Sequence, residues 1–374
     1  MKILFLSRSL DFGGAERQLA ILAKGLSISG WEVVVVSFYD HGLFGTELQH
    51  DGICVKYLNK KGRWDLFTFT RRLIKVIREE SPDIIHGYLP VPNILVVLLR
   101  SFIPPHKVVW GVRASNMDMD QYDWLSRLSY TFERYMSGYA DLIIANSQAG
   151  MEVMREKGFV IDRALVIPNG IDAHQFFPDE ESRIRIRASF QINDKEKFVG
   201  MVARLDPMKD HMTFIRAASQ LVKLRDDVRF ICVGEGLESY QSQLNMEAER
   251  LGVADKLIWA GGVEDMRGMY NALDIATLSS AYGEGFPNVI GEAMACGIPC
   301  VVTNVGDSAY IVGDTGAVVP SRHPEELAEA WNSMLDRLDN EGDQIRARAR
   351  DRLCSLFGEQ ALIKQTKQAL LKLF

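Results

Sequence analysis

The chain has 374 residues, of which 47% are hydrophobic and 25% charged, and its net charge is −6. This length exceeds what one ordinary core needs and suits two globular domains. The negative charge argues against a nucleic-acid-binding protein, and no stretch approaches the roughly 18 apolar residues that span a bilayer. The first residues, MKILFLSRSL, predict a buried strand and not a signal peptide, so we expect a cytoplasmic protein.

The five cysteines are scattered, and three residues separate Cys296 from Cys300. This spacing differs from that of Cys-x-x-Cys redox and zinc motifs. We therefore expect buried, reduced thiols, as in other cytosolic proteins.

Strand-like and helix-like segments alternate along the first half, which indicates a parallel sheet with crossover helices. The predicted strands cover residues 2–7, 31–38, 83–86, 107–111 and 142–146, and the clearest helices cover 15–25 and 65–80. The alternation pauses at Ile-Pro-Asn-Gly-Ile-Asp, residues 167–172, and in the polar stretch that follows. Proline, asparagine and glycine favour turns, so we predict a linker here.

A second series follows, with strands at 197–203, 228–234, 256–260, 275–278 and 299–303. Its helices are predicted at 212–223, 237–251, 266–272, 288–296 and 324–338, with an amphipathic stretch after residue 357. The sequence thus predicts an α/β protein of two doubly wound, Rossmann-like domains that face each other across a cleft. We place the domains at residues 1–168 and 169–355, and expect a C-terminal helix, 356–374, to pack back toward the first domain.

The most informative segment is SSAYGEGFPNVIGEAMACGIP, residues 279–299. A strand enters a loop that contains Gly283 and Gly285, and the loop leads into a helix near Asn288. Loop glycines let backbone approach a ligand, and a helix N-terminus offers unpaired N–H groups to phosphate. Glu284 on the loop and Glu292 on the helix should reach different parts of one ligand, unlike the facing carboxylates of a glycoside hydrolase.

This segment resembles the E-x7-E signature of glycosyltransferase family 4, here EGFPNVIGE. The resemblance continues in EAMACGIPCVVTNVGD, in VARLDPMKDH at 202–211, in IPNGID and in GGAER at 13–17. WGVRAS at 110–115 is most similar to bacterial enzymes that build O-antigen, capsule or exopolysaccharide. The resemblance covers almost the whole chain and implies the GT-B fold and a retaining transfer from a nucleotide sugar.

The resemblance also implies roles for residues of the second domain. Glu284 would be catalytic beside the donor sugar, and Glu292 would bind the nucleotide ribose. Arg204 and Lys209 would neutralise the diphosphate leaving group, which needs no metal. The donor-contacting backbone is expected at Gly285, Phe286, Pro287 and Asn288.

Alternatives remain open for some of these residues. Arg204 and Lys209 could be surface cations paired with Asp206 and Asp210. The resemblance implies that Gly13 and Gly14 close over the donor phosphate, but a tight turn alone would also explain them. By the same resemblance, Gly234 and Val263 should flank the base.

No cofactor or metal is expected, although Asp118-Met119-Asp120 spells the D-x-D metal motif of the other large glycosyltransferase fold. That motif must follow a strand end to bind a divalent ion through hard oxygens. Here it lies in a Met-rich, helix-like stretch.

Two residues of the first domain are candidates on the acceptor side. His86 ends a predicted strand and could bond sugar hydroxyls or relay a proton near neutral pH; a polar cap on a strand is the alternative. Arg113 stands where many family members carry a histidine, so a catalytic histidine at that position is in doubt.

Basic residues gather in the first domain, and an apolar loop at residues 100–107 is flanked by two cations. Residues 1–170 have a charge balance of +2 and the remainder −8. Because lipid-linked acceptors lie at the inner membrane face, we expect peripheral docking there through this surface; a solvated helix face is the alternative. The basic residues are Lys60, Lys61, Arg63, Arg71, Arg72, Lys75, Arg78, Arg100 and Lys107.

The sequence therefore predicts a glycosyltransferase that moves a sugar from a UDP-sugar to a lipid-linked or oligosaccharide acceptor in surface polysaccharide synthesis. Two alternatives are a sugar-nucleotide 2-epimerase of the same architecture and a non-catalytic subunit that binds nucleotide or glycan. An NAD-dependent oxidoreductase is disfavoured, because neither first βα turn carries the dinucleotide glycine pattern.

Overall fold

The computed structural model describes residues 1–11, 13–62, 64–113 and 124–374 of the chain. Arg63, the end of WGVRAS and the Asp118-Met119-Asp120 motif lie outside the described residues. The chain divides into two compact units. Unit 1 comprises Met1–Gly170 with Glu359–Phe374, and unit 2 comprises Ile171–Gly358.

Unit 1 is built on a parallel seven-stranded sheet of order β3-β2-β1-β4-β5-β6-β7. The central strands carry continuous apolar runs, such as Val33–Val36, because both faces of a parallel sheet are covered by helices. β1 and β2 pair in register from Lys2↔Glu32 to Ser7↔Ser37. The strands are β1 (Lys2–Ser7), β2 (Glu32–Ser37), β3 (Cys54–Tyr57), β4 (Ile84–Tyr88), β5 (Lys107–Val112), β6 (Leu142–Ala145) and β7 (Ala164–Val166).

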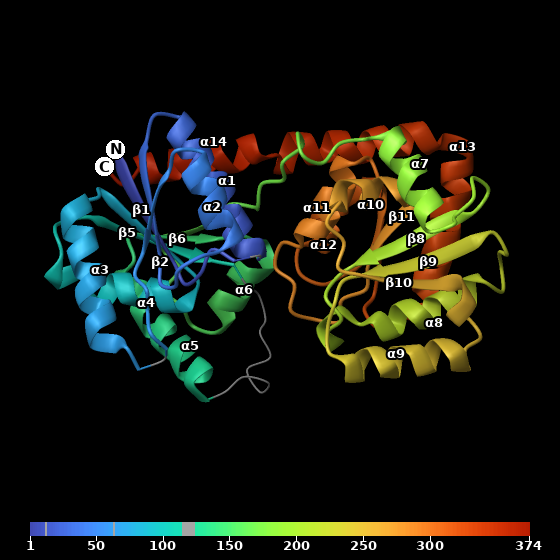
Figure 1. Cartoon of the computed structure of the whole chain (residues 1–374), viewed down its shortest axis with the longest axis horizontal. Coiled ribbons are helices and arrows are strands. Elements are labelled where there is room, and N and C mark those ends of the chain that lie inside the picture. Colours follow the sequence, from blue (N-terminus) through green and yellow to red (C-terminus); the bar gives the residue numbers. More distant parts are fainter. Residues whose placement is uncertain (12, 63, 114–123) are drawn as a thin grey trace. The chain divides into compact units, whose positions relative to one another are not determined.

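Helices cover both faces of this sheet (Figure 1). One face packs against α1 (Gly14–Ile28), α2 (Leu43–His50) and α14 (Glu359–Leu371). The other face packs against α3 (Leu66–Glu80), α4 (Pro90–Leu98), α5 (Trp124–Met136) and α6 (Gln148–Glu156). The sequence of α3 explains why it packs on the sheet, because the apolar residues Phe69, Leu73 and Ile77 recur every four residues and form one buried face.

The helix α14 belongs to unit 1 although it is the last element of the chain. It packs on α1, where Gly25 leaves space for Ile363: a Cβ at Gly25 would lie 2.2 Å from the Ile363 Cδ1. Leu362 and Leu370 are buried in the same core as β1 and α1. The core of unit 1 therefore combines segments from both ends of the sequence.

Unit 2 repeats the design with a parallel six-stranded sheet of order β10-β9-β8-β11-β12-β13. The strands are β8 (Lys197–Val202), β9 (Val228–Val233), β10 (Leu257–Gly261), β11 (Ile275–Leu278), β12 (Cys300–Thr303) and β13 (Ala317–Val319). One core holds α8 (His211–Leu221) and α9 (Glu238–Arg250). The other holds α7 (Glu180–Ser189), α10 (Met266–Ala272), α11 (Asn288–Ala295) and α12 (Ser308–Val312).

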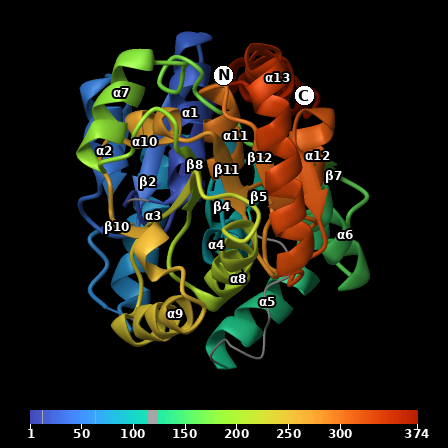
Figure 2. The same cartoon turned by 90° about the vertical axis from the view of Figure 1, so that its right-hand side faces the viewer.

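The helix α13 extends over Pro324–Phe357, and Figure 2 shows it in red beside the strands of unit 2. The predicted end near Leu338 was wrong, because the chain only kinks at Glu341 (φ −134°, ψ 24°) and then resumes the helix. Before the kink Trp331 packs with α8; after it Leu353 packs with α11. The polar stretch predicted as a linker also contains a helix start, since Asp179 caps α7.

Both sheets reverse their strand order at one place. In unit 1 the reversal lies between β1 and β4, and in unit 2 it lies between β8 and β11. The loops that follow such neighbouring strands leave in opposite directions and open a crevice at the carboxyl edge of the sheet. We therefore expect ligand-binding residues in the segments that follow β1, β4, β8 and β11.

Two sequence expectations concern cysteines and membrane spans. Cys232, Cys296 and Cys300 are buried, but Cys54 and Cys354 are exposed, so the expectation of buried thiols holds for three of the five. Among the described residues, no helix combines the length and apolar character that a membrane span requires.

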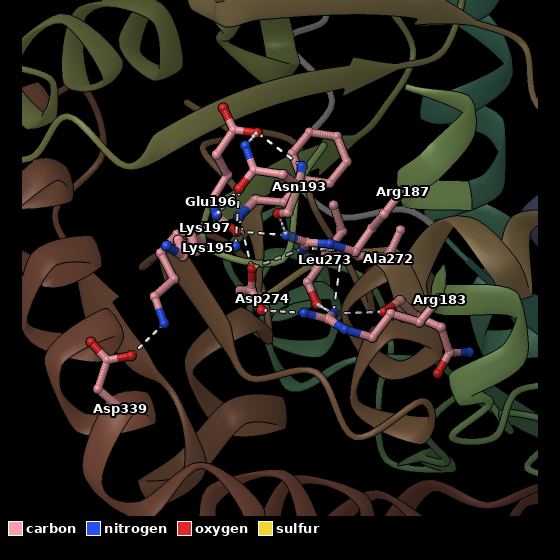
Figure 3. A network of polar contacts seen from close by, with 12 residues as sticks. Arg183, Arg187, Asn193, Lys195, Glu196, Lys197, Ala272, Leu273, Asp274 and Asp339 are labelled. Atoms are coloured by element: carbon pink, nitrogen blue, oxygen red, sulfur yellow. Dashed lines mark hydrogen bonds and ion pairs between the residues drawn. The ribbon is translucent and has the colours of Figure 1, made fainter. Parts of the chain in front are cut away.

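The amino edge of the unit 2 sheet is held by a buried carboxylate, Asp274, just before β11 (Figure 3). It accepts hydrogen bonds from Arg183 (2.7 Å) and Arg187 (3.2 Å) of α7, from Arg346 of α13 (3.3 Å) and from the Phe198 amide (2.8 Å). The two α7 arginines also donate to backbone carbonyls at the end of α10, where cations are favourable. One carboxylate thus ties α7, α10, β8 and α13 together.

Replacing Asp274 by asparagine should destabilise unit 2 by about 3–5 kcal/mol, because the buried Arg187 and the partly buried Arg183 and Arg346 would lose their counter-ion. Burial would raise the pKa of Asp274, but Arg183, Arg187 and the Phe198 amide outweigh it and hold the pKa below its ordinary value. The stabilisation is therefore present above the ordinary carboxyl pKa and is lost as pH falls through the lowered one.

Urea unfolding at neutral and acidic pH measures this effect. The control is Asp339→Asn, which removes a half-exposed partner of Lys197 in the same region and should cost no more than about 1 kcal/mol. Equal stability of the two variants would contradict the role assigned to Asp274.

Candidate active site

The candidate site of unit 2 lies where its strand order reverses. A short helical turn, η4 (Pro207–Lys209), follows β8, and the loop 279–287 follows β11. The two segments are bonded directly: the Ser279 hydroxyl donates to the Lys209 carbonyl (3.1 Å) and the Ala281 amide to the Met208 carbonyl (2.9 Å). On its other side the loop is held by Thr303, whose hydroxyl donates to the Ser280 carbonyl (2.7 Å). The loop is therefore a fixed part of the sheet edge.

Glu284 is the central acidic group of this loop and is only 6% exposed. One carboxylate oxygen, Oε1, accepts from the Lys209 ammonium at 2.5 Å and from the Ser280 hydroxyl at 2.5 Å. These short bonds involve an ionised group in a mostly buried position, where charge-assisted contacts are strong. The sequence predicted Glu284 and Lys209 for one site, and the structure brings them into contact. Ser280 was not predicted from the sequence.

Arg204 has a different environment from Lys209. Its side chain is 69% exposed and pairs with Asp206 at 2.8 Å. Asp210 does not pair with Lys209; its carboxylate caps α8 by accepting from the Thr213 amide. The alternative prediction of surface ion pairs with Asp206 and Asp210 therefore holds for Arg204 and is wrong for Lys209.

The helix α11 begins at Asn288, directly after Phe286 and Pro287. Its first N–H groups lie at the same sheet edge as Glu284 and give this edge a partial positive charge. Phe286 is buried and packs edge-on against Phe357, with ring centroids 5.4 Å apart, which fixes the entry into the helix.

Glu292 lies one turn into α11 and is 6% exposed. Its Oε2 accepts a hydrogen bond of 2.8 Å from the Tyr270 hydroxyl of α10. Tyr270 was not predicted as a site residue, since its partner lies 22 positions further along the chain.

The predicted base-flanking residues follow β9 and β10. Gly234 (φ +138°) lies against the end of β8, and a Cβ there would stand 2.2 Å from the Ala203 carbonyl oxygen. Its amide donates to the Gly261 carbonyl (2.8 Å), two residues before the partly buried Val263. Gly234 and Val263 thus belong to adjacent loops at the same edge of the sheet, and close backbone packing accounts for the glycine.

In unit 1, Gly13 and Gly14 follow β1 and open α1. Gly13 is the extended N-cap residue, and its carbonyl accepts from the Arg17 amide (3.0 Å). Burial raises the pKa of Glu16, which lies in the first turn of α1. A tight entry into the helix accounts for this geometry, and contact with a phosphate stays a prediction.

The prediction that His86 ends its strand was wrong, because β4 continues to Tyr88. His86 is fully buried between β1 and β5. Neither ring nitrogen has a hydrogen-bond partner among the described residues. Burial, and then the charge of Arg113, hold the pKa of His86 well below its ordinary value. The ring is therefore neutral near pH 7 and poorly placed to carry a proton there, and bonding to a sugar stays a prediction.

Arg113 follows β5 and is held by unit 1 itself. It donates to the Tyr88 hydroxyl (2.8 Å) and to Asn169 Oδ1 (3.1 Å), and its guanidinium lies 4.7 Å from the Tyr88 ring centroid. An arginine fixed on an aromatic ring at the carboxyl edge of a sheet can bind hydroxyls or anions. Its part in acceptor binding stays a prediction.

The described part of the chain holds no cluster of three or more His, Cys, Asp or Glu that could bind a metal ion. His211, beside Lys209, is fully buried at the start of α8. Burial, helped by the Lys209 charge, lowers its pKa to about 4. The site of unit 2 thus offers fixed cations and carboxylates rather than a titrating histidine.

Two family models match the chain. Residues 12–175 match the model described as Glycosyltransferase Family 4, and residues 182–352 match the model described as Glycosyl transferases group 1. The two matches together span nearly all of both units. The chain belongs to the family 4 glycosyltransferases, with a GT-B fold of two parallel-sheet domains.

Two similar proteins also have names that describe them as glycosyltransferases. The chain is 23% identical over 367 residues to EpsF of Bacillus subtilis, whose name describes it as a glycosyltransferase, covering 95% of this chain and 92% of EpsF. It is 27% identical to a D-inositol 3-phosphate glycosyltransferase of Paenarthrobacter aurescens, covering 91% and 88%.

Among solved structures, Anabaena Alr3699/HepE is similar over the full length of both chains. Its complex with UDP gives a TM-score of 0.87 and its complex with UDP-glucose 0.84, each at 25% identity. The chain is therefore a glycosyltransferase with a nucleotide-sugar-binding fold.

The substitution Gly306→Ala tests how closely Glu284 must be placed. At Gly306 (φ +60°) a Cβ would lie 2.4 Å from the Glu284 carbonyl oxygen, so the loop would have to move. We expect a loss of stability of about 1–2 kcal/mol from the left-handed backbone, and a roughly 100-fold loss of turnover from the displaced Glu284.

The matched control is Gly252→Ala, which has the same backbone penalty (φ +66°) but open space around the added Cβ. Thermal unfolding and nucleotide-sugar turnover of both variants give the comparison. If both variants keep full turnover, the position of Glu284 does not govern activity.

Proposed function

We propose that this chain transfers a sugar, with retention of anomeric configuration, from a UDP-sugar to a lipid-linked or oligosaccharide acceptor in surface polysaccharide synthesis. The observation that carries the proposal is the contact of Glu284 with Lys209 and Ser280 at the strand reversal of unit 2. Ser280 and Glu284 lie in the sequence between β11 and the start of α11, where a phosphate-bearing ligand is favoured, and Lys209 lies in η4 after β8.

The chemistry follows from the charges at this edge. The leaving group is a nucleoside diphosphate, so negative charge grows on it in the transition state. Lys209, Arg204 and the first N–H groups of α11 would stabilise that charge without a metal. The hydrogen bond that ties the loop to η4 keeps these groups close together at the sheet edge.

The ion pair itself implies a role for Glu284. A diphosphate that binds Lys209 competes with the Glu284 carboxylate for the same ammonium. Glu284 would then keep the Ser280 hydroxyl and turn its remaining acceptor capacity to the hydroxyls of the donor sugar. The acceptor hydroxyl would attack an oxocarbenium-like centre on the face that the diphosphate leaves.

The choice of UDP is supported by similarity. The Anabaena structures contain UDP and UDP-glucose, and the likeness extends over the whole of both chains. The acceptor class and the polysaccharide pathway rest on the sequence resemblance of WGVRAS to enzymes of O-antigen, capsule and exopolysaccharide assembly.

Replacing Glu284 by alanine should abolish turnover, because the donor sugar would lose its orienting carboxylate. The measurement is release of nucleoside diphosphate from UDP-, GDP- and ADP-sugars, with and without EDTA. Thermal shifts with each donor show which nucleotide stabilises the protein. We expect UDP-sugars alone to bind and turn over, and EDTA to have no effect.

The control variant is Glu238→Ala, which removes an exposed glutamate of α9 and should keep full turnover. Normal turnover by the Glu284 variant would refute its catalytic role. A 2-epimerised nucleotide sugar in the donor-only reaction would identify an epimerase, and no turnover of any donor would leave a binding subunit.

We also propose that unit 1 docks on an anionic membrane surface, which would bring the chain to a lipid-linked acceptor at the inner face. Trp64, which precedes α3, and Phe67, in its first turn, are 84% and 82% exposed. Lys61 and Arg71 are exposed close to them in sequence. Large exposed aromatic groups beside cations fit a lipid headgroup region.

Other members of the predicted basic cluster have structural partners. Arg72 donates to the Leu58 carbonyl (2.9 Å), Arg78 to the Phe102 carbonyl (2.8 Å), and Arg100 pairs with Asp141 (3.1 Å). The described residues that remain for the docking surface are two exposed cations, Lys61 and Arg71, and two exposed aromatic residues, Trp64 and Phe67.

Co-sedimentation with vesicles that contain an anionic lipid tests this surface. The double variant Trp64→Ala/Phe67→Ala should weaken binding at least roughly tenfold, since burying each such side chain contributes about 1.5–3 kcal/mol. The control is Leu237→Ala, an equally exposed apolar residue of unit 2. Absence of wild-type binding at low salt would rule out docking.

A further inference from the structure

We infer that Tyr270 is a positioning residue that sets the orientation of Glu292 and thereby the recognition of the nucleotide ribose. The inference rests on the proposed function and on the ribose-binding role that the sequence resemblance implies for Glu292. The observation behind it is the 2.8 Å hydrogen bond from the Tyr270 hydroxyl to Glu292 Oε2.

Both partners are buried. Tyr270 is 1% exposed and Glu292 6%, and Tyr270 lies in the same apolar core as Ile290 and Met294, the neighbours of Glu292 on α11. Burying a carboxylate in such a core is costly unless hydrogen-bond donors compensate for the lost water. The phenol provides one, and a bond from O–H to a carboxylate is among the stronger hydrogen bonds of proteins.

The hydrogen bond from Tyr270 also affects the orientation of the Glu292 carboxylate. The terminal torsion of a glutamate is broad, so the plane of its carboxylate is set by its partners and not by rotamer preference. A fixed phenol bonded to Oε2 therefore contributes directly to how the carboxylate is presented to a ligand. Recognition of two adjacent ribose hydroxyls is sensitive to that plane, because both must donate to one group.

Tyr270 itself is held from several sides. Its ring packs edge-on against Phe176, with centroids 5.9 Å apart. At the start of α10, Asp265 caps the Gly268 amide (2.9 Å); at its end, Arg183 donates to the Asn271 carbonyl (2.9 Å).

The neighbouring Asn271 adds a further tie, since its Oδ1 accepts from the Asp179 amide (2.8 Å) and its Nδ2 donates to the Phe177 carbonyl (3.0 Å). The helix that carries the phenol is thus rigid, and the Asp274 network stabilises the same helix end.

A purely structural role for Tyr270 would affect ligand binding differently from a role in positioning Glu292. The loss of its hydroxyl would then lower stability and weaken every ligand of unit 2 alike. Positioning of Glu292 instead affects only ligands with ribose hydroxyls. Comparison of UDP with 2′,3′-dideoxy-UDP separates the two roles, because these ligands differ only in the groups that Glu292 would bind.

The experiment measures the Kd of both nucleotides by calorimetry for the wild type, Tyr270→Phe, Glu292→Gln and the double variant. We expect the wild type to prefer UDP, and Tyr270→Phe to lose roughly tenfold in UDP affinity with a change below about twofold for the dideoxy analogue. The double variant should be no weaker than Glu292→Gln alone, which shows that Tyr270 acts through Glu292. The control is Tyr310→Phe, whose exposed ring packs on Phe357 and should leave both affinities unchanged.

The outcomes distinguish this inference from the proposed function. If the wild type binds UDP and its dideoxy analogue equally, ribose recognition by Glu292 fails, and the inference falls with it. If the wild type discriminates and Tyr270→Phe discriminates equally well, only the inference is overturned. An equal loss for both nucleotides in Tyr270→Phe would also overturn it, in favour of a structural role.

Discussion

The ion pair between Lys209 and Glu284 joins the two segments that leave β8 and β11, the strands at which the order of the unit 2 sheet reverses. Parallel strands end at one edge, and the reversal sends their loops apart, so a crevice there is a consequence of topology. Unlike charges hold its two walls at hydrogen-bond distance. The glycines, the Ser279 and Ser280 hydroxyls and the start of α11 are arranged around that contact.

The opposite edge of the same sheet is held by the inverse arrangement, one carboxylate among three arginines. There every charge is used for cohesion, because the Arg183 and Arg187 guanidinium groups are occupied by Asp274 and by backbone carbonyls. At the carboxyl edge, by contrast, Arg204 is largely exposed and Lys209 is held by a group with which a ligand can compete. The two edges of the sheet therefore differ: charges at the amino edge hold helices together, and cations at the carboxyl edge remain within reach of a ligand.

Much of this architecture could be predicted from the sequence. Apolar runs of four residues marked the strands, and Glu284, Glu292 and Asn288 were predicted at the correct loop and helix. What could not be predicted depends on packing between distant segments. The phenol of Tyr270 meets Glu292 only because α10 lies on α11, and Asp274 meets Arg183 across 91 positions. His86 was predicted to end its strand, yet pairing with β5 extends β4 to Tyr88. The helix that starts at Pro324 was predicted to end near Leu338, but it kinks at Glu341 and continues to Phe357.

The return of α14 to unit 1 has a consequence for synthesis. The first 170 residues leave the ribosome with the face of α1 that receives Ile363 and Leu370 still uncovered, and the whole of unit 2 must be made before the missing helix arrives. Unit 2 is continuous and can fold as soon as it emerges, whereas unit 1 is completed last although it begins first. The apolar groove on α1 is therefore exposed during translation, where a chaperone would recognise it. A protein shortened at its C-terminus would carry the same groove permanently.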